Sequence, residues 1–367
     1  MENRVCKLLG IDYPIIQAPM AGFSTVAMAA AVSNAGALGS IALGASNHVH
    51  ARKLIEEMQE ETGAPFSLNF FCHAPAEHDA EREARWLAYL EPYFAQFDAR
   101  PPTGLKEIYK SFVEDEDMQD LVLAMPPRAV SFHFGLPPGP CIAALKKAGC
   151  VLLASATCAD EARQIEDAGI DIIVAQGYES GGHRGVFEPQ KGDPAIGTFE
   201  LVRAIRRQSA LPIVAAGGIM NGQDIAAIMA EGADAVQLGT AFVLCPESSA
   251  HDEYRAAMKS SRARETVISD VISGRPARGI PNRLFNEIGA PDHPPLPDYP
   301  ITYDATKALN AAASKRGNYD FAVNWAGTGA PLARELPAGE LVQVLANELA
   351  TALANALTRE LAEGKKR

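Results

Sequence analysis

Short apolar segments alternate with helical ones along the first 240 residues of the chain. Eight of the apolar segments have the length and residue types of buried strands, and sequences with helical periodicity separate most of them. The strands are predicted at residues 14–18, 38–42, 66–71, 129–134, 151–156, 171–176, 212–217 and 235–239. Strands that alternate with helices are typical of a parallel α/β fold.

The turn after the first strand helps to choose between two such folds. A doubly wound open sheet usually has a G-x-G-x-x-G fingerprint there, whereas this chain has "APMAGFS". Eight strands with intervening helices over about 240 residues are typical of a (β/α)8 (TIM) barrel. Three helix ends agree with this pattern: one helix is expected to begin at a capping Ser24 and stop at Gly36, and the helices in 158–169 and 221–232 end in glycine.

Two segments interrupt the alternation. Residues 73–125 form a charged insertion with a helical sequence, and residues 246–330 lack the periodicity of a barrel. Connections that leave the carboxyl ends of barrel strands build the active-site face. We therefore expect a barrel over 1–245, with the insertion contributing to a smaller, mainly helical substrate or lid domain over 246–330. The remainder, 331–367, is predicted to hold an amphipathic helix packed on the barrel.

Charge and composition limit the partners. The net charge of −12 argues against binding to nucleic acid or to an anionic membrane, and no apolar stretch of about 18 residues or signal peptide is present. The six cysteines show no C-x-x-C spacing, which predicts buried thiols in a reducing compartment and no metal site. We expect a cytoplasmic monomer or homodimer that acts on small molecules.

Two glycine turns carry the first chemical signal. "AAGGI" (215–219) and "QLGTAF" (237–242) follow the last two predicted strands, where barrels of this type commonly bind phosphate. Glycines there expose backbone N–H groups to a phosphate. Gly217, Gly218, Gly239 and Thr240 are the candidates, and the alternative is a pair of tight turns without ligand.

A flat surface is predicted opposite this cradle. Ala18, Pro19 and Met20, after the first strand, offer small groups and main chain against which a planar ring could lie. Gln176, at the end of the sixth strand, adds an amide that can donate and accept. A phosphate cradle beside such a floor suits flavin mononucleotide (FMN) better than a sugar phosphate.

The catalytic candidate is His183 in "QGYESGGHRGVFEP", which follows the sixth strand on the same barrel face. A lone histidine is commonly structural, but its place in a glycine-rich loop at this face favours a functional role. Arg184 is expected to be structural. His133, in "SFHFG", fits a pocket-lining position and a buried packing position equally well.

Phenol and ammonium groups from the interrupting segments could bind a small anion. The candidates are Tyr109, Tyr254, Tyr299, Tyr303 and Lys307. Tyr303 and Lys307 lie one turn apart if a helix begins near Asp304. Ordinary domain packing is the alternative for all of these side chains.

At these residues the sequence resembles a known family. "IIQAPMAG", "GYESGGHRG", "IVAAGGI" and "AVQLGTAF" are similar, in order and spacing, to the signature segments of the nitronate monooxygenases, FMN-dependent (β/α)8 enzymes formerly called 2-nitropropane dioxygenases. The resemblance extends to about residue 330, where "DYPITY" and "NWAGTGA" resemble the class I branch. Ser180 stands where the family commonly has alanine.

The resemblance implies roles for individual residues. It implies that FMN contacts Met20, Gln176, Gly181, Gly217, Gly218, Gln237, Gly239 and Thr240. It implies that His183 is the active-site histidine, and that the substrate pocket is lined by Tyr109, His133, Tyr254, Tyr299, Tyr303 and Lys307.

It also implies a reaction. An alkyl nitronate such as propionate 3-nitronate would be oxidised with O2, through a flavin semiquinone, to an aldehyde or ketone and nitrite. His183 would bond the nitro oxygens and act as a base only toward a neutral nitroalkane. Lys307 and the tyrosine hydroxyls would anchor a substrate carboxylate.

Three other functions fit parts of the pattern. A flavin-dependent NAD(P)H reductase of quinones or enoyl thioesters could use the same barrel and glycine turns. A non-catalytic flavin carrier or sensor, or a flavin-free enzyme acting on a sugar phosphate, would use fewer of the candidate residues. The tyrosine-rich lid favours a small polar anion as the substrate.

Overall fold

The computed structural model describes residues 3–364 and contains the predicted barrel. Its strands are β1 (Ile15–Gln17), β2 (Gly39–Ala42), β3 (Phe66–Phe71), β4 (Ala129–His133), β5 (Val151–Ala156), β6 (Ile172–Gln176), β8 (Ile213–Ala216) and β9 (Ala235–Leu238). They are parallel neighbours in the order β1-β9-β8-β6-β5-β4-β3-β2. A parallel bridge between Ile16 and Leu38 joins the two edge strands, where the Gln17 N–H donates to the Leu38 carbonyl at 2.9 Å. The predicted (β/α)8 barrel is confirmed.

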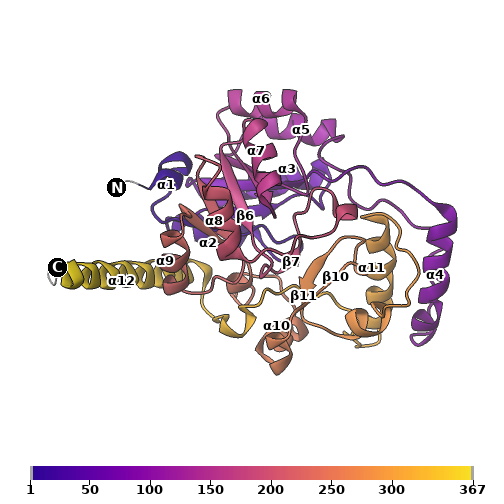
Figure 1. The fold of residues 1–367 in the computed structure, drawn as a ribbon. Coiled ribbons are helices and arrows are strands. Elements are labelled where there is room, and N and C mark those ends of the chain that lie inside the picture. Colours follow the sequence, from indigo (N-terminus) through magenta and orange to yellow (C-terminus); the bar gives the residue numbers. More distant parts are fainter. Residues whose placement is uncertain (1–2, 365–367) are drawn as a thin grey trace.

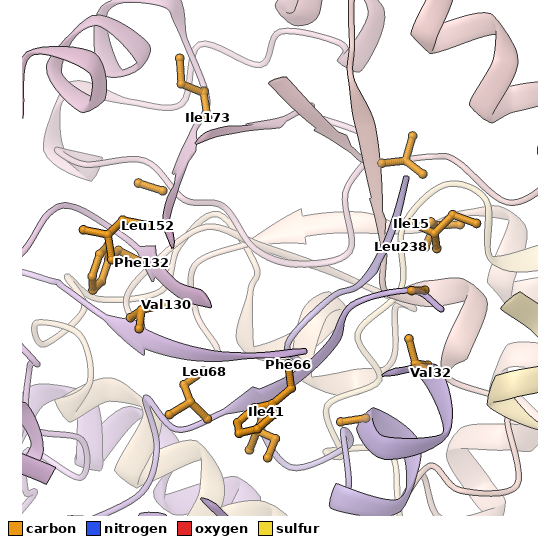
Figure 2. Close-up of a cluster of buried hydrophobic side chains, with 14 of the residues drawn as sticks. Ile15, Val32, Ile41, Phe66, Leu68, Val130, Phe132, Leu152, Ile173 and Leu238 are labelled. Carbon is orange, nitrogen blue, oxygen red and sulfur yellow. The ribbon is translucent and has the colours of Figure 1, made fainter. Parts of the chain in front are cut away.

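Alternate residues along the strands pack into two separate apolar layers of the barrel. Ile15, Leu152 and Ile173 belong to the core between strands and surrounding helices, part of which is drawn in Figure 2. Their chain neighbours, among them Ile16 and Leu153, belong to an inner cluster, because successive strand residues point to opposite faces. Helix α1 (Arg4–Leu9) packs apolar side chains into this inner cluster.

Helices surround the strands, as the alternating pattern predicts. They are α2 (Val26–Asn34), α3 (His48–Glu61), α5 (Glu116–Ala124), α6 (Gly139–Lys147), α7 (Ala159–Asp167), α8 (Thr198–Arg206) and α9 (Gly222–Ala230). The predicted cap of α2 was wrong by one residue: the Thr25 side chain accepts the Met28 N–H. Ser24 instead accepts the Met20 N–H at 2.8 Å, so it stabilises the turn after β1.

A smaller unit stands beside the barrel and combines both interrupting segments. It contains α4 (Ala80–Ala95), α10 (Asp252–Lys259), β10 (Val267–Ser269), β11 (Ala277–Gly279) and α11 (Ile301–Ser314). The insertion helix α4 lies against α11 (Figure 1), and Trp86 and Leu90 share one apolar cluster with Ile301 and Leu309. Strand β11 pairs with β10 on one side and with a short barrel-loop strand, β7 (Gly182–His183), on the other, in a sheet that the sequence did not predict.

The last helix, α12 (Ala338–Gly364), packs on the barrel over its first half only. Leu341, Leu345 and Leu349 are buried against α2 and α9. Farther along, α12 extends away from the barrel (Figure 1), and Leu353 and Leu357 are exposed. Within residues 3–364, no helix combines the length and apolarity needed to cross a membrane.

Candidate active site

A cavity of about 810 Å³ opens where the barrel strands end and the smaller unit begins. Every candidate site residue from the sequence lines it. From the proposed cofactor set these are Ala18, Pro19, Met20, Gln176, Gly181, Gly217, Gly218, Gln237, Gly239 and Thr240. From the proposed catalytic and substrate set they are His183, Tyr109, His133, Tyr254, Tyr299, Tyr303 and Lys307. The structure thus brings together residues from both units around one space.

Free backbone donors gather at the ends of β8 and β9. The N–H groups of Gly218, Gly239 and Thr240 donate to no acceptor within the described residues. Gly217 and Gly218 have positive φ values of 121° and 74°, which a side chain would strain. A Cβ at Gly218 would lie 3.2 Å from the Glu179 Cβ. Three unpaired backbone donors on the two adjacent turns after β8 and β9 form the type of cradle that binds a phosphate.

The floor beside this cradle is small and apolar. A Cβ at Gly239 would lie 3.3 Å from the Ala18 Cβ and 3.6 Å from the Met20 Sδ, so the glycine keeps the floor low. The half-buried Gln237 side chain makes no hydrogen bond to the described residues and is free to contact a ligand. A planar heteroaromatic ring with a phosphate-bearing chain therefore fits the shape and the donors of this part of the cavity.

Gln176, which lines the cavity, also forms hydrogen bonds with the loop that follows β6. Its Nε2 donates to the His183 carbonyl at 2.9 Å, and its Oε1 accepts the Gly185 N–H at 2.7 Å. The amide therefore fixes the loop that carries His183, and one Nε2 hydrogen remains for a ligand.

His183 is held between the two units. Strand β7 pairs antiparallel with β11, with His183 opposite Ala277, and the His183 Nε2 lies 2.8 Å from the Ser273 Oγ. The imidazole is half-buried at the cavity wall, and its centroid lies 5.0 Å from that of Trp325. Burial is the main cause that lowers the pKa of His183 to about 3, followed by repulsion from His133 when that ring is protonated and from the charge of Arg275. His183 is therefore neutral at physiological pH.

Arg184 has the structural role that the sequence predicted. Its side chain is fully buried, and its Nε lies 2.7 Å from a carboxylate oxygen of Asp193. Its Nη1 donates to the main-chain carbonyls of Gln176 and Gly177 at 3.1 and 2.6 Å. The buried ion pair and these bonds hold the loop after β6 in one shape.

His133 both lines the cavity and supports its neighbour. Its Nε2 lies 3.2 Å from the His183 carbonyl, which can only accept, so Nε2 carries the proton. Its Nδ1 then accepts from the Ser155 hydroxyl at 3.0 Å. Burial lowers the pKa of His133 to about 4, so this neutral arrangement persists at physiological pH.

A cation and two rings form the far end of the cavity. The Lys307 Nζ lies 5.0 Å from the Tyr109 ring centroid and 4.9 Å from that of Tyr303. Lys307 has no described carboxylate oxygen within 4.0 Å, and desolvation of its ammonium lowers its pKa although the more distant charge of Asp304 acts in the opposite direction. An ammonium held between aromatic rings without a carboxylate partner suits an anionic ligand group.

The other two tyrosines differ in what their hydroxyls do. The Tyr254 hydroxyl donates to the Trp325 carbonyl and the ring is fully buried, so Tyr254 positions Trp325. The Tyr299 hydroxyl is buried and has no hydrogen-bond partner among the described residues, and burial raises its pKa. Tyr299 is therefore a neutral donor at the cavity wall that is free to bond a ligand.

Comparison with known proteins shows the family of this chain. The family model described as nitronate monooxygenase matches residues 2–348. This chain belongs to the nitronate monooxygenase family. It is 57% identical over 349 residues to a nitronate monooxygenase of Pseudomonas aeruginosa, covering 95% of this chain and 99% of the relative. It is 54% identical to one of Paraburkholderia phytofirmans, with 95% of each chain covered.

Solved structures also superpose on this member of the nitronate monooxygenase family. The nitroalkane oxidase of Streptomyces ansochromogenes superposes with a TM-score of 0.87 at 38% identity, over 96% of this chain and 99% of that one. FabK of Thermotoga maritima superposes with a TM-score of 0.73 at 27% identity, over 98% and 99%. The family is one of flavin-type oxidoreductases.

In this member of the nitronate monooxygenase family, several cavity residues escaped the sequence analysis. Trp325 lies in the segment "NWAGTGA", and its aromatic side chain was the signal that could have identified it. Asn69, a lone amide in the apolar strand "FSLNFF", also lines the cavity and donates to the Ser131 Oγ at 2.9 Å. Ser273 and Arg275 approach His183 and its neighbours from the smaller unit, and no local pattern marks them.

Proposed function

We propose that this protein is an FMN-dependent nitronate monooxygenase of the class I type that oxidises small alkyl nitronates with O2 to a carbonyl compound and nitrite. Propionate 3-nitronate is the substrate that the site suits best. One observation carries the proposal: a single cavity combines free backbone N–H groups on glycine turns, a flat floor, a neutral histidine and a lysine that forms no ion pair with a described carboxylate.

The barrel side of the cavity would hold the cofactor. The free N–H groups of Gly218, Gly239 and Thr240 would bond the phosphate, and Ala18 and Met20 would lie against the ring. When bound, FMN would supply the one-electron oxidation of the nitronate and pass the electron to O2.

The protein's own groups would bind and orient the substrate. A nitronate is already an anion, so no base is needed, and a neutral His183 can donate a hydrogen bond to its nitro oxygens. The rings of Trp325, Tyr299 and Tyr303 surround this position and would exclude water from it.

Lys307 would bind the carboxylate at the other end of propionate 3-nitronate. We expect Lys307→Met to lower kcat/KM for propionate 3-nitronate about ten- to a hundredfold, because a hydrogen bond between charged groups contributes roughly 1.5–3 kcal/mol. The loss for propyl 1-nitronate, which has no carboxylate, should be much smaller. Steady-state oxygen uptake measures both, and equal losses would show that Lys307 does not bind the carboxylate.

The reaction class is tested by anaerobic spectroscopy on the purified, flavin-loaded protein. Propionate 3-nitronate is added to one sample and NADPH or NADH to another. The proposal expects the nitronate to change the flavin absorption within the mixing time and the nicotinamides to leave it unchanged. Rapid bleaching by a nicotinamide with no response to the nitronate would identify a reductase instead.

A further inference from the structure

The hydroxyl of Ser273, a residue of the smaller unit, forms a hydrogen bond with the His183 ring. Ser273 is fully buried, and its Oγ lies 2.8 Å from the His183 Nε2. The same Oγ lies 3.3 Å from the Arg275 N–H, which can only donate, and 3.4 Å from the Arg275 carbonyl, which can only accept. These are its hydrogen-bonding neighbours among the described residues.

The turn that carries Ser273 is fixed on both sides. The N–H groups of Ser273 and Gly274 both donate to the Asp270 carbonyl, at 3.2 and 2.8 Å. Gly274 has a φ of +90°, and a Cβ there would lie 2.9 Å from the Pro297 carbonyl oxygen. The Thr306 hydroxyl donates to the Ile272 carbonyl at 2.6 Å. The hydroxyl is therefore presented to His183 by a turn that has little freedom to move.

The Arg275 guanidinium, which follows the turn, is also held in place. The Arg275 Nη1 donates to the Val186 carbonyl at 2.7 Å, and the guanidinium carbon lies 4.5 Å from the Phe134 ring centroid. Arg275 is buried, and its charge helps to lower the pKa of His183. A neutral imidazole carries its single proton on either Nδ1 or Nε2, and the group bonded to one nitrogen decides which.

Proton counting then selects one arrangement. The Ser273 hydroxyl has one hydrogen and two possible acceptors, the His183 Nε2 at 2.8 Å and the Arg275 carbonyl at 3.4 Å. If Nε2 were protonated, it would donate to Oγ and leave the buried hydroxyl hydrogen only the Arg275 carbonyl at 3.4 Å, too far for a good O–H···O bond. We therefore infer that the hydroxyl donates to Nε2 while it accepts from the Arg275 N–H. Nε2 is then without a proton, and the proton resides on Nδ1. The described residues provide no partner for Nδ1, and the ring lines the cavity.

We propose that Ser273 is a positioning residue that holds His183 with its proton on Nδ1 and thereby favours anionic nitronates over neutral nitroalkanes as substrates. An Nδ1–H group is a donor, which suits the negative oxygens of a nitronate. A bare Nδ1 would be an acceptor and a base, which suits removal of a proton from a neutral nitroalkane. The inference deepens the proposed function and rests on it for the identity of the substrate.

The tautomer can be measured without any turnover. Nitrogen-15 NMR on histidine-labelled, flavin-loaded protein distinguishes protonated from bare ring nitrogens, and His183→Asn identifies the His183 signals. We expect a protonated Nδ1 and a bare Nε2 at pH 7. A protonated Nε2 in the wild-type protein would overturn the proposal even if nitronate oxidation is normal. A protein with the expected tautomer that oxidises no nitronate would instead refute the proposed function.

The preference itself is tested with Ser273→Ala and Ser273→Thr. The ratio of kcat/KM for propyl 1-nitronate to that for neutral 1-nitropropane should fall about tenfold in Ser273→Ala, because the tautomer is no longer fixed by a hydrogen bond. Ser273→Thr retains the hydroxyl and should restore most of the ratio.

Ser33→Ala is the matched control. Ser33 is also buried, donates to the Pro65 carbonyl at 2.9 Å and accepts the Gly39 N–H at 3.1 Å, but it lies in α2 away from the cavity. The ratio of the two kcat/KM values in Ser33→Ala should equal that of the wild type. An unchanged ratio in Ser273→Ala, or an equal fall in Ser33→Ala, would overturn the proposal. If Ser273→Ala does not fold, the wild-type tautomer decides.

Discussion

Three histidines lie close to the buried guanidinium of Arg275. Burial is the main reason why the pKa values of His73 and His133 fall to about 4 and that of His183 to about 3, and the charge of Arg275 adds to the effect. In an unfolded chain the same rings have a pKa near 6.5. Between pH 6.5 and pH 4 the unfolded chain therefore binds more protons than the folded one, and stability falls as the pH is lowered through this range.

His73 allows the pH dependence of stability to be tested at a single residue. Neither of its ring nitrogens meets a partner at hydrogen-bond geometry, although the Tyr109 main chain is near, and its ring packs edge-on against Tyr299 at 4.9 Å. Phenylalanine keeps the packing and cannot bind a proton. When the pH is lowered from 7 to 5, the free energy of unfolding of wild type should fall by about 1–2 kcal/mol more than that of His73→Phe. Urea unfolding at the two pH values measures it, and an unchanged difference would contradict it.

At the scale of helices and strands, the sequence predicted what depends on local pattern. All eight barrel strands lie within their predicted ranges because parallel strands buried on both faces are nearly continuous apolar runs. Strand β7 has only two residues and no periodic signal, and its pairing with β11 depends on a segment far along the chain. The α2 cap could not be chosen locally either, because Ser24 and Thr25 are both good caps and the turn after β1 decides between them.

The loop between β6 and α8 depends on one buried ion pair. Removing the carboxylate in Asp193→Ala leaves the fully buried Arg184 guanidinium without its counter-charge. We expect the free energy of unfolding to fall by about 3 kcal/mol. Asp160→Ala is the control, because Asp160 and its partner Arg163 are exposed, and its effect should stay below about 0.5 kcal/mol. Similar losses in the two variants would show that Arg184 does not need Asp193.

We predict that the turn after β8 binds phosphate only if residue 218 is glycine. In Gly218→Ala the new Cβ would lie 3.2 Å from the Glu179 Cβ at a φ of +74° and would disturb the free N–H groups. We expect FMN affinity to fall at least about tenfold, measured by flavin release on dialysis. Gly192→Ala carries similar backbone strain at a φ of +87° with nothing within 4 Å, and should retain FMN. Retention of FMN by both variants would remove this turn from the phosphate site.

For the whole molecule, the sequence predicted which residues line the cavity but not which contacts these residues make with one another. The glycine turns and His183 follow predictable strands, so their place at one barrel face could be predicted from the chain. The contacts of Ser273, Trp325 and Tyr254 depend on how the smaller unit docks against that face. Tyr254 illustrates the limit: its hydroxyl is used by the Trp325 carbonyl, a partner that residue type and spacing cannot reveal.

The barrel and the α4–α11 part of the smaller unit have different apolar clusters, while a third cluster joins the two units around Tyr254. The proposed cofactor cradle belongs to the barrel, whereas Tyr303 and Lys307 lie on α11, whose Ile301 and Leu309 pack in one cluster with Trp86 of α4. Trp86 is fully buried. Trp86→Ala should therefore create a cavity in the smaller unit alone, at a cost of about 3–5 kcal/mol.

Such a variant should bind FMN normally and yet bind substrate poorly. We expect Trp86→Ala to retain its flavin after dialysis while KM for propionate 3-nitronate rises, because α11 loses the support that positions Lys307. Trp86→Phe is the control: it keeps most of the apolar volume and removes an indole N–H that has no partner among the described residues, so its KM should stay near that of wild type. If Trp86→Ala loses flavin together with substrate binding, the two cores unfold as one cooperative unit, and the division of tasks between them is wrong.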